Sequence, residues 1–151
     1  MHPNRGAEVA KLTSGDVQEI FLIREGLEST ALRLSVPKMT EVDFAKAEEI
    51  LNRIDSDPDP THMAELNWEF HESLYRAGCL PRLIGIARTL NNNALPYHHL
   101  GYVKYNGKAL SQKGHREILA ACRARNEIAA IDALLDHLRF SASLVIPHLQ
   151  A

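Results

Sequence analysis

The sequence predicts an all-α protein, an antiparallel bundle of about six helices. From Asp16 onward, apolar residues recur every three or four positions, the period of a helix that buries one face. Breaks rich in proline, glycine and asparagine divide this pattern into segments of ordinary helical length. The 151 residues, 45% hydrophobic and 24% charged, suffice for one domain with its own core.

The first helix follows a segment of different character. Residues 1–15 hold turn residues and a short alternation, so we interpret them as a linker with a possible strand, and residues 16–151 as the bundle. Asp16 and Glu19 resemble a capping box, which predicts a helix from Asp16 to about Pro37.

The next two helices are separated by a clear break. Thr40 is the expected cap of the second helix. Residues 55–60 contain two prolines and four short polar residues, which cannot continue a helix. Thr61 then starts the third helix, and we expect Gly78 to end it.

The fourth helix starts near Pro81, and the asparagines at 91–93 with Pro96 predict a kink or a break in it. Residues 101–110 hold two glycines and little periodicity, so we expect a loop there. The fifth helix is expected from about Ser111.

The last helix follows a turn. Arg125 and Asn126 have the composition of a short connection. A long apolar pattern then runs from Glu127 toward Pro147, with His137 at the edge of its apolar stripe.

The overall composition argues against several classes of protein. A formal net charge of −2 disfavours a domain that binds nucleic acid through its bulk charge. The two cysteines, Cys79 and Cys122, are expected to be buried free thiols. Because no membrane-spanning run and no secretory signal are found, we expect a soluble, cytoplasmic protein without membrane contact.

Four polar residues in the apolar pattern predict a metal site. Asn67 and His71 lie four positions apart on the third helix, so both side chains point the same way. His115 and His137 lie on or beside the inward stripes of two other helices. Burying such groups without partners is costly. Three imidazoles and one amide oxygen suit a divalent ion such as zinc, nickel or manganese.

The predicted site suggests an anionic ligand. Neutral ligands leave the bound ion near +2, which would attract a small carboxylate. Arg24, on the inward stripe of the first helix, has two interpretations: it pairs with a nearby glutamate, or it holds the carboxylate at the metal. His98 and His99 diverge by about 100° on a helix and cannot both face one site. The remaining histidines are expected to be solvated: His2, His62 and His148.

Several motifs resemble a known family. The stretch Ile23–Ala31 is similar to the R-x-x-L-E-x-x-A opening helix of the FCD domain, the effector-binding domain of FadR-type transcription regulators in the GntR superfamily. Asn67-x-x-Phe70-His71 resembles its D/N-x-x-F-H motif, and Gly114-His115-Arg116-Glu117-Ile118-Leu119 its E-H-x-x-I-L motif. His137-Leu138 matches the H-L of its last helix.

The resemblance implies a helical bundle, often homodimeric, with metal ligands at Asn67, His71, His115 and His137 and an effector-contacting arginine at Arg24. It covers residues 16–146 with three departures: Asn67 stands where Asp is commoner, Cys79-Leu80-Pro81 replaces a Gly-Asn turn, and Gly114 stands where an acid is usual. Only residues 4–9 resemble the end of the winged helix-turn-helix that precedes this domain in whole regulators, so we expect no direct DNA contact from this chain.

Three functions are consistent with these features. The first is a metal-dependent sensor of a small organic acid that signals through a homodimer. The second is a hydrolase with three histidine ligands, which would also need a general base; Glu69 and Glu72 point away from His71 on the helix. The third is a structural helical module with packed core histidines.

Overall fold

The computed structural model describes residues 11–104 and 106–151, and within them it consists of six α-helices joined by short connections. Helix periodicity therefore predicted the fold class correctly. The helices span α1 (Ser14–Ser35), α2 (Glu41–Ser56), α3 (Met63–Tyr75), α4 (Pro81–Lys104), α5 (Gly107–Arg123) and α6 (Glu127–Val145). Short 3₁₀ turns follow α1, α3 and α6 and precede α3. The linker predicted at 1–15 lies mostly outside the described residues.

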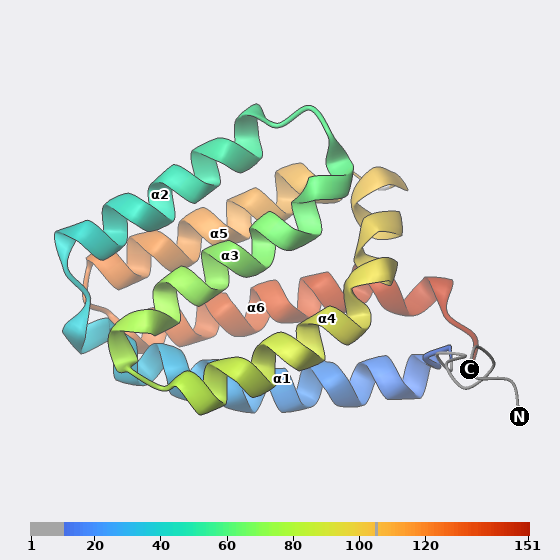
Figure 1. Cartoon of the computed structure of the whole chain (residues 1–151), viewed down its shortest axis with the longest axis horizontal. Coiled ribbons are helices and arrows are strands. Elements are labelled where there is room, and N and C mark those ends of the chain that lie inside the picture. Colours follow the sequence, from blue (N-terminus) through green and yellow to red (C-terminus); the bar gives the residue numbers. More distant parts are fainter. Residues whose placement is uncertain (1–10, 105) are drawn as a thin grey trace, which may run out of the picture.

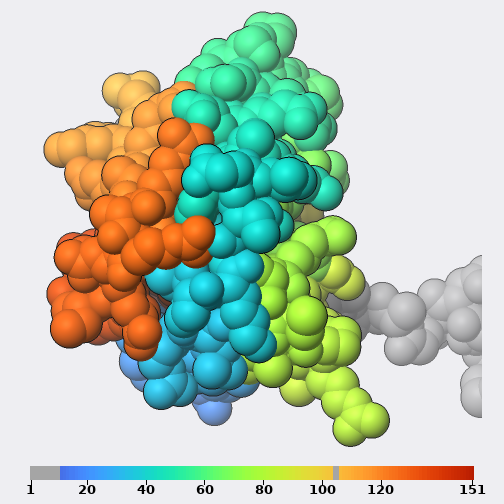
Figure 2. All heavy atoms as spheres, turned by 90° about the vertical axis from the view of Figure 1, so that its left-hand side faces the viewer, coloured from blue at the N-terminus to red at the C-terminus, as the bar shows by residue number. Residues whose placement is uncertain are grey.

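The helices pack as a bundle around one apolar core. Helix α6 contacts α1, α4 and α5, and α3 contacts α1, α2 and α4 (Figure 1). At one end of the bundle, the α1–α2 connection, the α5–α6 turn and the start of α4 lie together (Figure 2). At the other end the Ser14 amide donates to the Gln150 carbonyl at 2.8 Å, which joins the C-terminal segment to the start of α1. Every helix thus buries one face against its neighbours.

The caps of the first helices differ in part from the prediction. The capping box of α1 is formed by Thr13 and Asp16, not by Asp16 and Glu19, so the helix begins one residue after Thr13. The expected cap at Thr40 is confirmed, with a reciprocal bond to Asp43. A Thr side chain at the N-cap accepts a hydrogen bond from a backbone amide that has no partner within the helix, and the acid three residues later completes the box.

The end of α3 also differs from the expectation. The helix ends at Tyr75, and the left-handed residue after it is Cys79, with φ 55°, not Gly78. Gly78 instead allows close packing, because a Cβ there would lie 2.8 Å from the Ser35 hydroxyl oxygen. Cys79 is exposed, contrary to prediction, whereas Cys122 is buried as expected.

The prediction of a loop at residues 101–110 was wrong. Helix α4 continues to Lys104 and α5 begins at Gly107. Gly101 is needed for close packing rather than for a turn, since a Cβ on it would lie 2.7 Å from the Cβ of Leu144 on α6. Pro96 bends α4 without breaking it; the change of direction is visible in Figure 1.

The buried faces match the predicted stripes except at a few positions. Leu34 and Val42, which fall on the apolar period of the first and second helices, are 42% and 76% exposed. Glu28 on α1 and Tyr75 on α3 are polar but buried, next to the site described below. Within the described residues, no helix is both long enough and apolar enough to cross a lipid bilayer.

Candidate metal centre

Three histidines from three different helices meet in the core. His71 on α3, His115 on α5 and His137 on α6 each offer a ring nitrogen, and these atoms all lie within 4.8 Å of one another. The ring centroids of His115 and His137 are 4.3 Å apart, and those of His71 and His137 are 4.9 Å apart. All three side chains are buried. The sequence prediction that these residues converge agrees with this geometry.

A hydrogen-bond chain determines the tautomer of His71. The Tyr75 hydroxyl donates to Glu28 Oε1 at 2.8 Å, so its oxygen accepts from His71 Nδ1, 3.2 Å away. His71 must then carry its proton on Nδ1. Its lone pair is on Nε2, which points away from Tyr75. That Nε2 atom is buried and has no hydrogen-bond partner. Metal-binding histidines commonly show this arrangement, with one nitrogen held by an outer partner and the other left for the ion.

His115 is oriented in the same way by a different partner. Gln112 donates through Nε2 to the Leu51 carbonyl and to Asp55 Oδ1, so its Oε1 faces His115 Nδ1, at 2.7 Å, as an acceptor. The proton of His115 is therefore on Nδ1 and the lone pair on Nε2. Gln112 connects the site to the end of α2, a contact between helices that no local pattern predicts.

Asn67 contacts the free nitrogen of His115. Asn67 Oδ1 lies 2.6 Å from His115 Nε2, so two lone pairs face each other. Such a pair repels unless a proton or a cation lies between them, and an ion bound by both atoms removes the conflict. Turning the amide over would satisfy this pair alone, because His71 Nε2 and both nitrogens of His137 would still have no partner.

His137 is packed against a glycine. An added Cβ on Gly114 would lie 2.9 Å from His137 Nδ1, so the imidazole occupies the space that a side chain at 114 would fill. Gly114 replaces the acidic residue that the resembled motif carries there, and the structure gives this departure a steric reason. A surface hollow of about 170 Å³ between α5 and α6 reaches His137 at this point.

Burial keeps the histidines neutral. Desolvation lowers the pKa of His71 and of His115 well below the usual value, and it lowers the pKa of His137 to about 3. The charge of Arg24 acts in the same direction on His71 and His137. Neutral imidazole is the form that binds a metal ion. The donor set and its protonation both fit a divalent cation.

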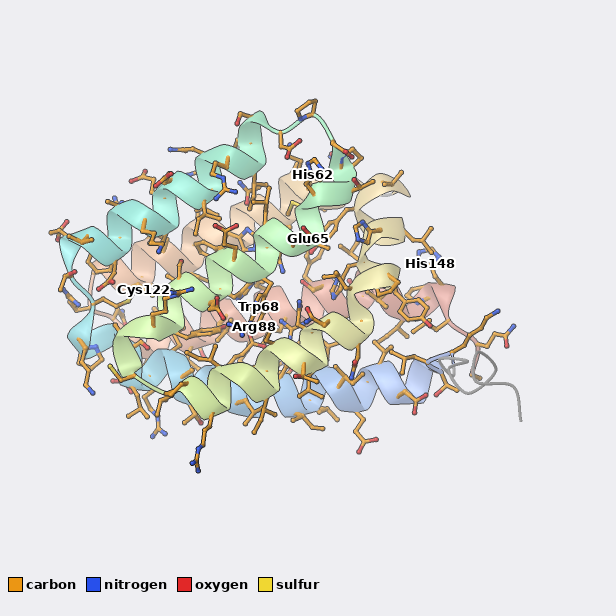
Figure 3. All side chains as sticks on the ribbon, in the orientation of Figure 1. His62, Glu65, Trp68, Arg88, Cys122 and His148 are labelled. Carbon is orange, nitrogen blue, oxygen red and sulfur yellow. The ribbon has the colours of Figure 1, made fainter. Side chains whose placement is uncertain are left out.

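Arg24 and Glu28 form a buried ion pair beside the histidines. Arg24 Nε donates to Glu28 Oε2 at 2.7 Å, with 1% and 0% of the two side chains exposed. Arg24 therefore pairs with a glutamate, which is one of the two interpretations drawn from the sequence. This bond uses Nε and leaves the two terminal nitrogens of the guanidinium group out. The Arg24 Cζ lies 5.2 Å from the centroid of the Phe21 ring and 6.0 Å from that of the Trp68 ring. Trp68 lies in the middle of the bundle (Figure 3).

His98 was missed by the sequence analysis. It is buried on α4, and neither of its ring nitrogens has a partner. Burial lowers the pKa of His98 to about 3, with the charge of Arg24 as the second cause. Position 98 continues the stripe of Ala87 and Ala94 at helical spacing, which could have indicated that it faces inward. His62 is exposed, as expected, and bonds Asp57 (Figure 3).

Two glutamates on α3 pair with arginines and not with the clustered histidines. Glu69 pairs with Arg53 at 2.8 Å on the surface, and Glu72 lies against Arg76 and Arg88. Glu28 is 3.8 Å from His71 Nδ1, but Arg24 and Tyr75 hold it. Each of these three carboxylates is thus paired with another side chain in the described structure.

Comparison with known proteins identifies relatives across most of the chain. The model of the FCD domain family matches residues 19–140. The "Uncharacterized HTH-type transcriptional regulator YdhC" of Bacillus subtilis (strain 168) is 27% identical over 139 residues, 87% of this chain and 61% of that protein. The chain therefore spans about three fifths of the length of this relative.

Solved structures agree with the fold. A GntR-family transcriptional regulator from Pseudomonas syringae pv. tomato str. DC3000 is 26% identical, with a TM-score of 0.77 over 97% of this chain and 62% of that one. Streptococcus agalactiae GntR is 27% identical, with a TM-score of 0.69 over 84% of this chain and 58% of that one. E. coli McbR/YncC, at 20% identity and a TM-score of 0.78, covers 93% of this chain and 72% of its own, and shows the shared fold alone.

Proposed function

This chain belongs to the FCD domain family, and we propose that it is the metal-dependent, carboxylate-sensing domain of a GntR-type transcription regulator. The observation that supports this most is the set of neutral imidazoles of His71, His115 and His137, each of which offers one ring nitrogen within 4.8 Å of the other two. Asn67 supplies the fourth donor, an amide oxygen. The ion would be zinc, nickel or manganese, and it would hold an anion at its open positions.

Arg24 is the proposed partner of the bound carboxylate. Its guanidinium is buried beside the histidines, and its charge contributes to the lowered pKa of His71 and of His137. A planar fork with several donors matches a carboxylate in geometry and charge. Glu28 already neutralises part of this charge, so the incoming acid would share or replace that contact.

Binding would act on helix packing. An acid held between Arg24 on α1 and an ion on α3, α5 and α6 couples four helices that meet in the core. We propose that the domain is a homodimer and that the dimer passes this shift to a DNA-binding domain outside this chain. Apolar side chains exposed on the neighbouring α1 and α4 support a dimer, among them Leu22 at 66% and Val103 at 59%. Sedimentation should give twice the 16.9 kDa chain mass.

Metal analysis and calorimetry test the proposal. The untagged protein should bind about one zinc, nickel or manganese ion per chain, His71→Ala should lose it, and His62→Ala, which changes an exposed histidine, should keep it. The metal-loaded protein should bind at least one of a panel of small organic acids, and the metal-free protein should not. A metal content far below one per chain would favour the structural module, and ester hydrolysis abolished by His71→Ala would favour the hydrolase.

A further inference from the structure

Two charged pairs join α2 to α5 on the surface of the bundle, where the two helices lie side by side (Figure 1). Glu48 bonds Arg123 at 2.5 Å, and α2 supplies the acid. Asp55 bonds Arg116 in the same way one helical stretch further along α2. All four side chains are 44–48% exposed. Asp55 differs from Glu48 because it also accepts a hydrogen bond at 2.8 Å from Gln112, which is buried. One of two similar surface pairs therefore reaches the interior.

Two acceptors use both hydrogens of the Gln112 amide nitrogen. Nε2 donates at 2.9 Å to the Leu51 carbonyl and at 2.8 Å to Asp55 Oδ1. Burial raises the pKa of the Asp55 carboxyl, but hydrogen bonds from Gln112 and Arg116 outweigh it and lower that pKa, so the group is an acceptor only at neutral pH. If the amide were turned over, its oxygen would face two acceptors. Oε1 is therefore kept on the side of His115.

His115 has two neutral tautomers, and each has a partner. With the proton on Nδ1, the ring donates to Gln112 Oε1, 2.7 Å away, and the lone pair of Nε2 is available to an ion. With the proton on Nε2, the ring donates to Asn67 Oδ1, 2.6 Å away, and that nitrogen cannot bind an ion. The orientation of the Gln112 amide selects between the two, because a turned amide would present hydrogens to Nδ1 and favour the second tautomer.

We propose that Asp55 is a positioning residue of the metal site. From the surface of α2 it holds the Gln112 amide, and through this amide it keeps the proton of His115 on Nδ1 and the lone pair on Nε2. The inference rests on the proposed metal-dependent function and adds to it a residue outside the ligand set. It also joins α2, which carries none of the four proposed ligands, to the site.

Matched variants of the full chain test this role by zinc competition with a chromophoric chelator. Asp55→Ala should lower the affinity for zinc about 10-fold. This is the lower end of the usual effect of an outer partner, because the Leu51 carbonyl still holds the Gln112 amide. Glu48→Ala removes an acid and its arginine pair from the same helix. Arg116→Ala removes the ion pair of Asp55 but keeps its bond to Gln112. Both controls should change the affinity by less than about two-fold.

NMR of the histidine side chains in the metal-free protein gives a second readout that does not depend on metal binding. Two-bond proton–nitrogen correlations distinguish a protonated ring nitrogen from an unprotonated one. His115 should carry its proton on Nδ1 in the unchanged protein and in Glu48→Ala. In Asp55→Ala a second population with the proton on Nε2 should appear. A general loss of packing would not select one tautomer of one ring, and circular dichroism checks that each variant is folded.

Three results would contradict the reasoning in different ways. If Asp55→Ala and Glu48→Ala bind zinc equally tightly, Asp55 does not position the site, and the metal-dependent function stands. If His115 carries its proton on Nε2 in the unchanged protein, the Gln112 amide does not select the tautomer and the inference is wrong. If the unchanged protein binds no zinc, nickel or manganese while the tautomer still changes in Asp55→Ala, the proposed function fails and only the control of His115 by Asp55 remains.

Discussion

Removing the Tyr75 hydroxyl should lower both the free energy of unfolding and the metal affinity, and the two effects can be measured separately. Tyr75→Phe deletes the oxygen that links Glu28 to His71 and changes little else in shape. The lost bond to the Glu28 carboxylate is worth about 1.5–3 kcal/mol, and the neutral bond from His71 about 1 kcal/mol. The metal-free variant should therefore unfold with a free energy lower by about 2.5–4 kcal/mol. Without its outer partner, His71 no longer has a fixed tautomer, so metal affinity should fall about 10- to 100-fold.

Two assays follow these effects. Urea unfolding monitored by circular dichroism, with chelator present, gives the free energy of unfolding of the metal-free protein. Competition with a chromophoric chelator gives the metal affinity. The matched control is Tyr97→Phe, which should cost about 1 kcal/mol and leave metal affinity unchanged, because its hydroxyl bonds the Leu12 amide and none of the three clustered histidines. If Tyr75→Phe binds metal as tightly as the unchanged protein, Tyr75 does not position His71 and the inferred tautomer is wrong.

Two further predictions concern the histidines. Gly114→Ala should weaken metal binding at least ten-fold in the same competition assay, since its Cβ would lie 2.9 Å from His137 Nδ1; Gly26→Ala, where nothing lies within 4 Å, should leave the affinity unchanged. Acid should destabilise the metal-free protein, because the unfolded chain takes up protons below about pH 6.5 that the folded chain does not. The pKa values of about 3 make this loss about 1.2 kcal/mol each for His98 and His137 between pH 7 and 5.5, and His71 and His115 add to it. An identical melting temperature at the two pH values would contradict this.

The helical period alone predicted the fold class and the inward position of the three histidines. A helix repeats every 3.6 residues, so a polar residue that falls on an apolar stripe must face the core, wherever its neighbours come from. That rule placed His71, His115 and His137 inside, and the core of a small bundle is narrow enough that three inward imidazoles can meet. The same rule places His98 inside, because it continues the stripe of Ala87 and Ala94.

The contacts that orient the histidines from outside the cluster depended on the tertiary structure. Glu28 and Tyr75 are 47 residues apart, and Gln112 reaches Asp55 across 57. No local pattern encodes such contacts, because they depend on how two helices cross and on which rotamers the packing allows. The glycine at 101 looked like a loop residue for the same reason: its purpose, the close approach of α4 to Leu144, exists only once the helices are packed. Sequence periodicity determined which residues face inward; packing decided which of them meet, which nitrogen stays free and which buried polar groups have no hydrogen-bond partner.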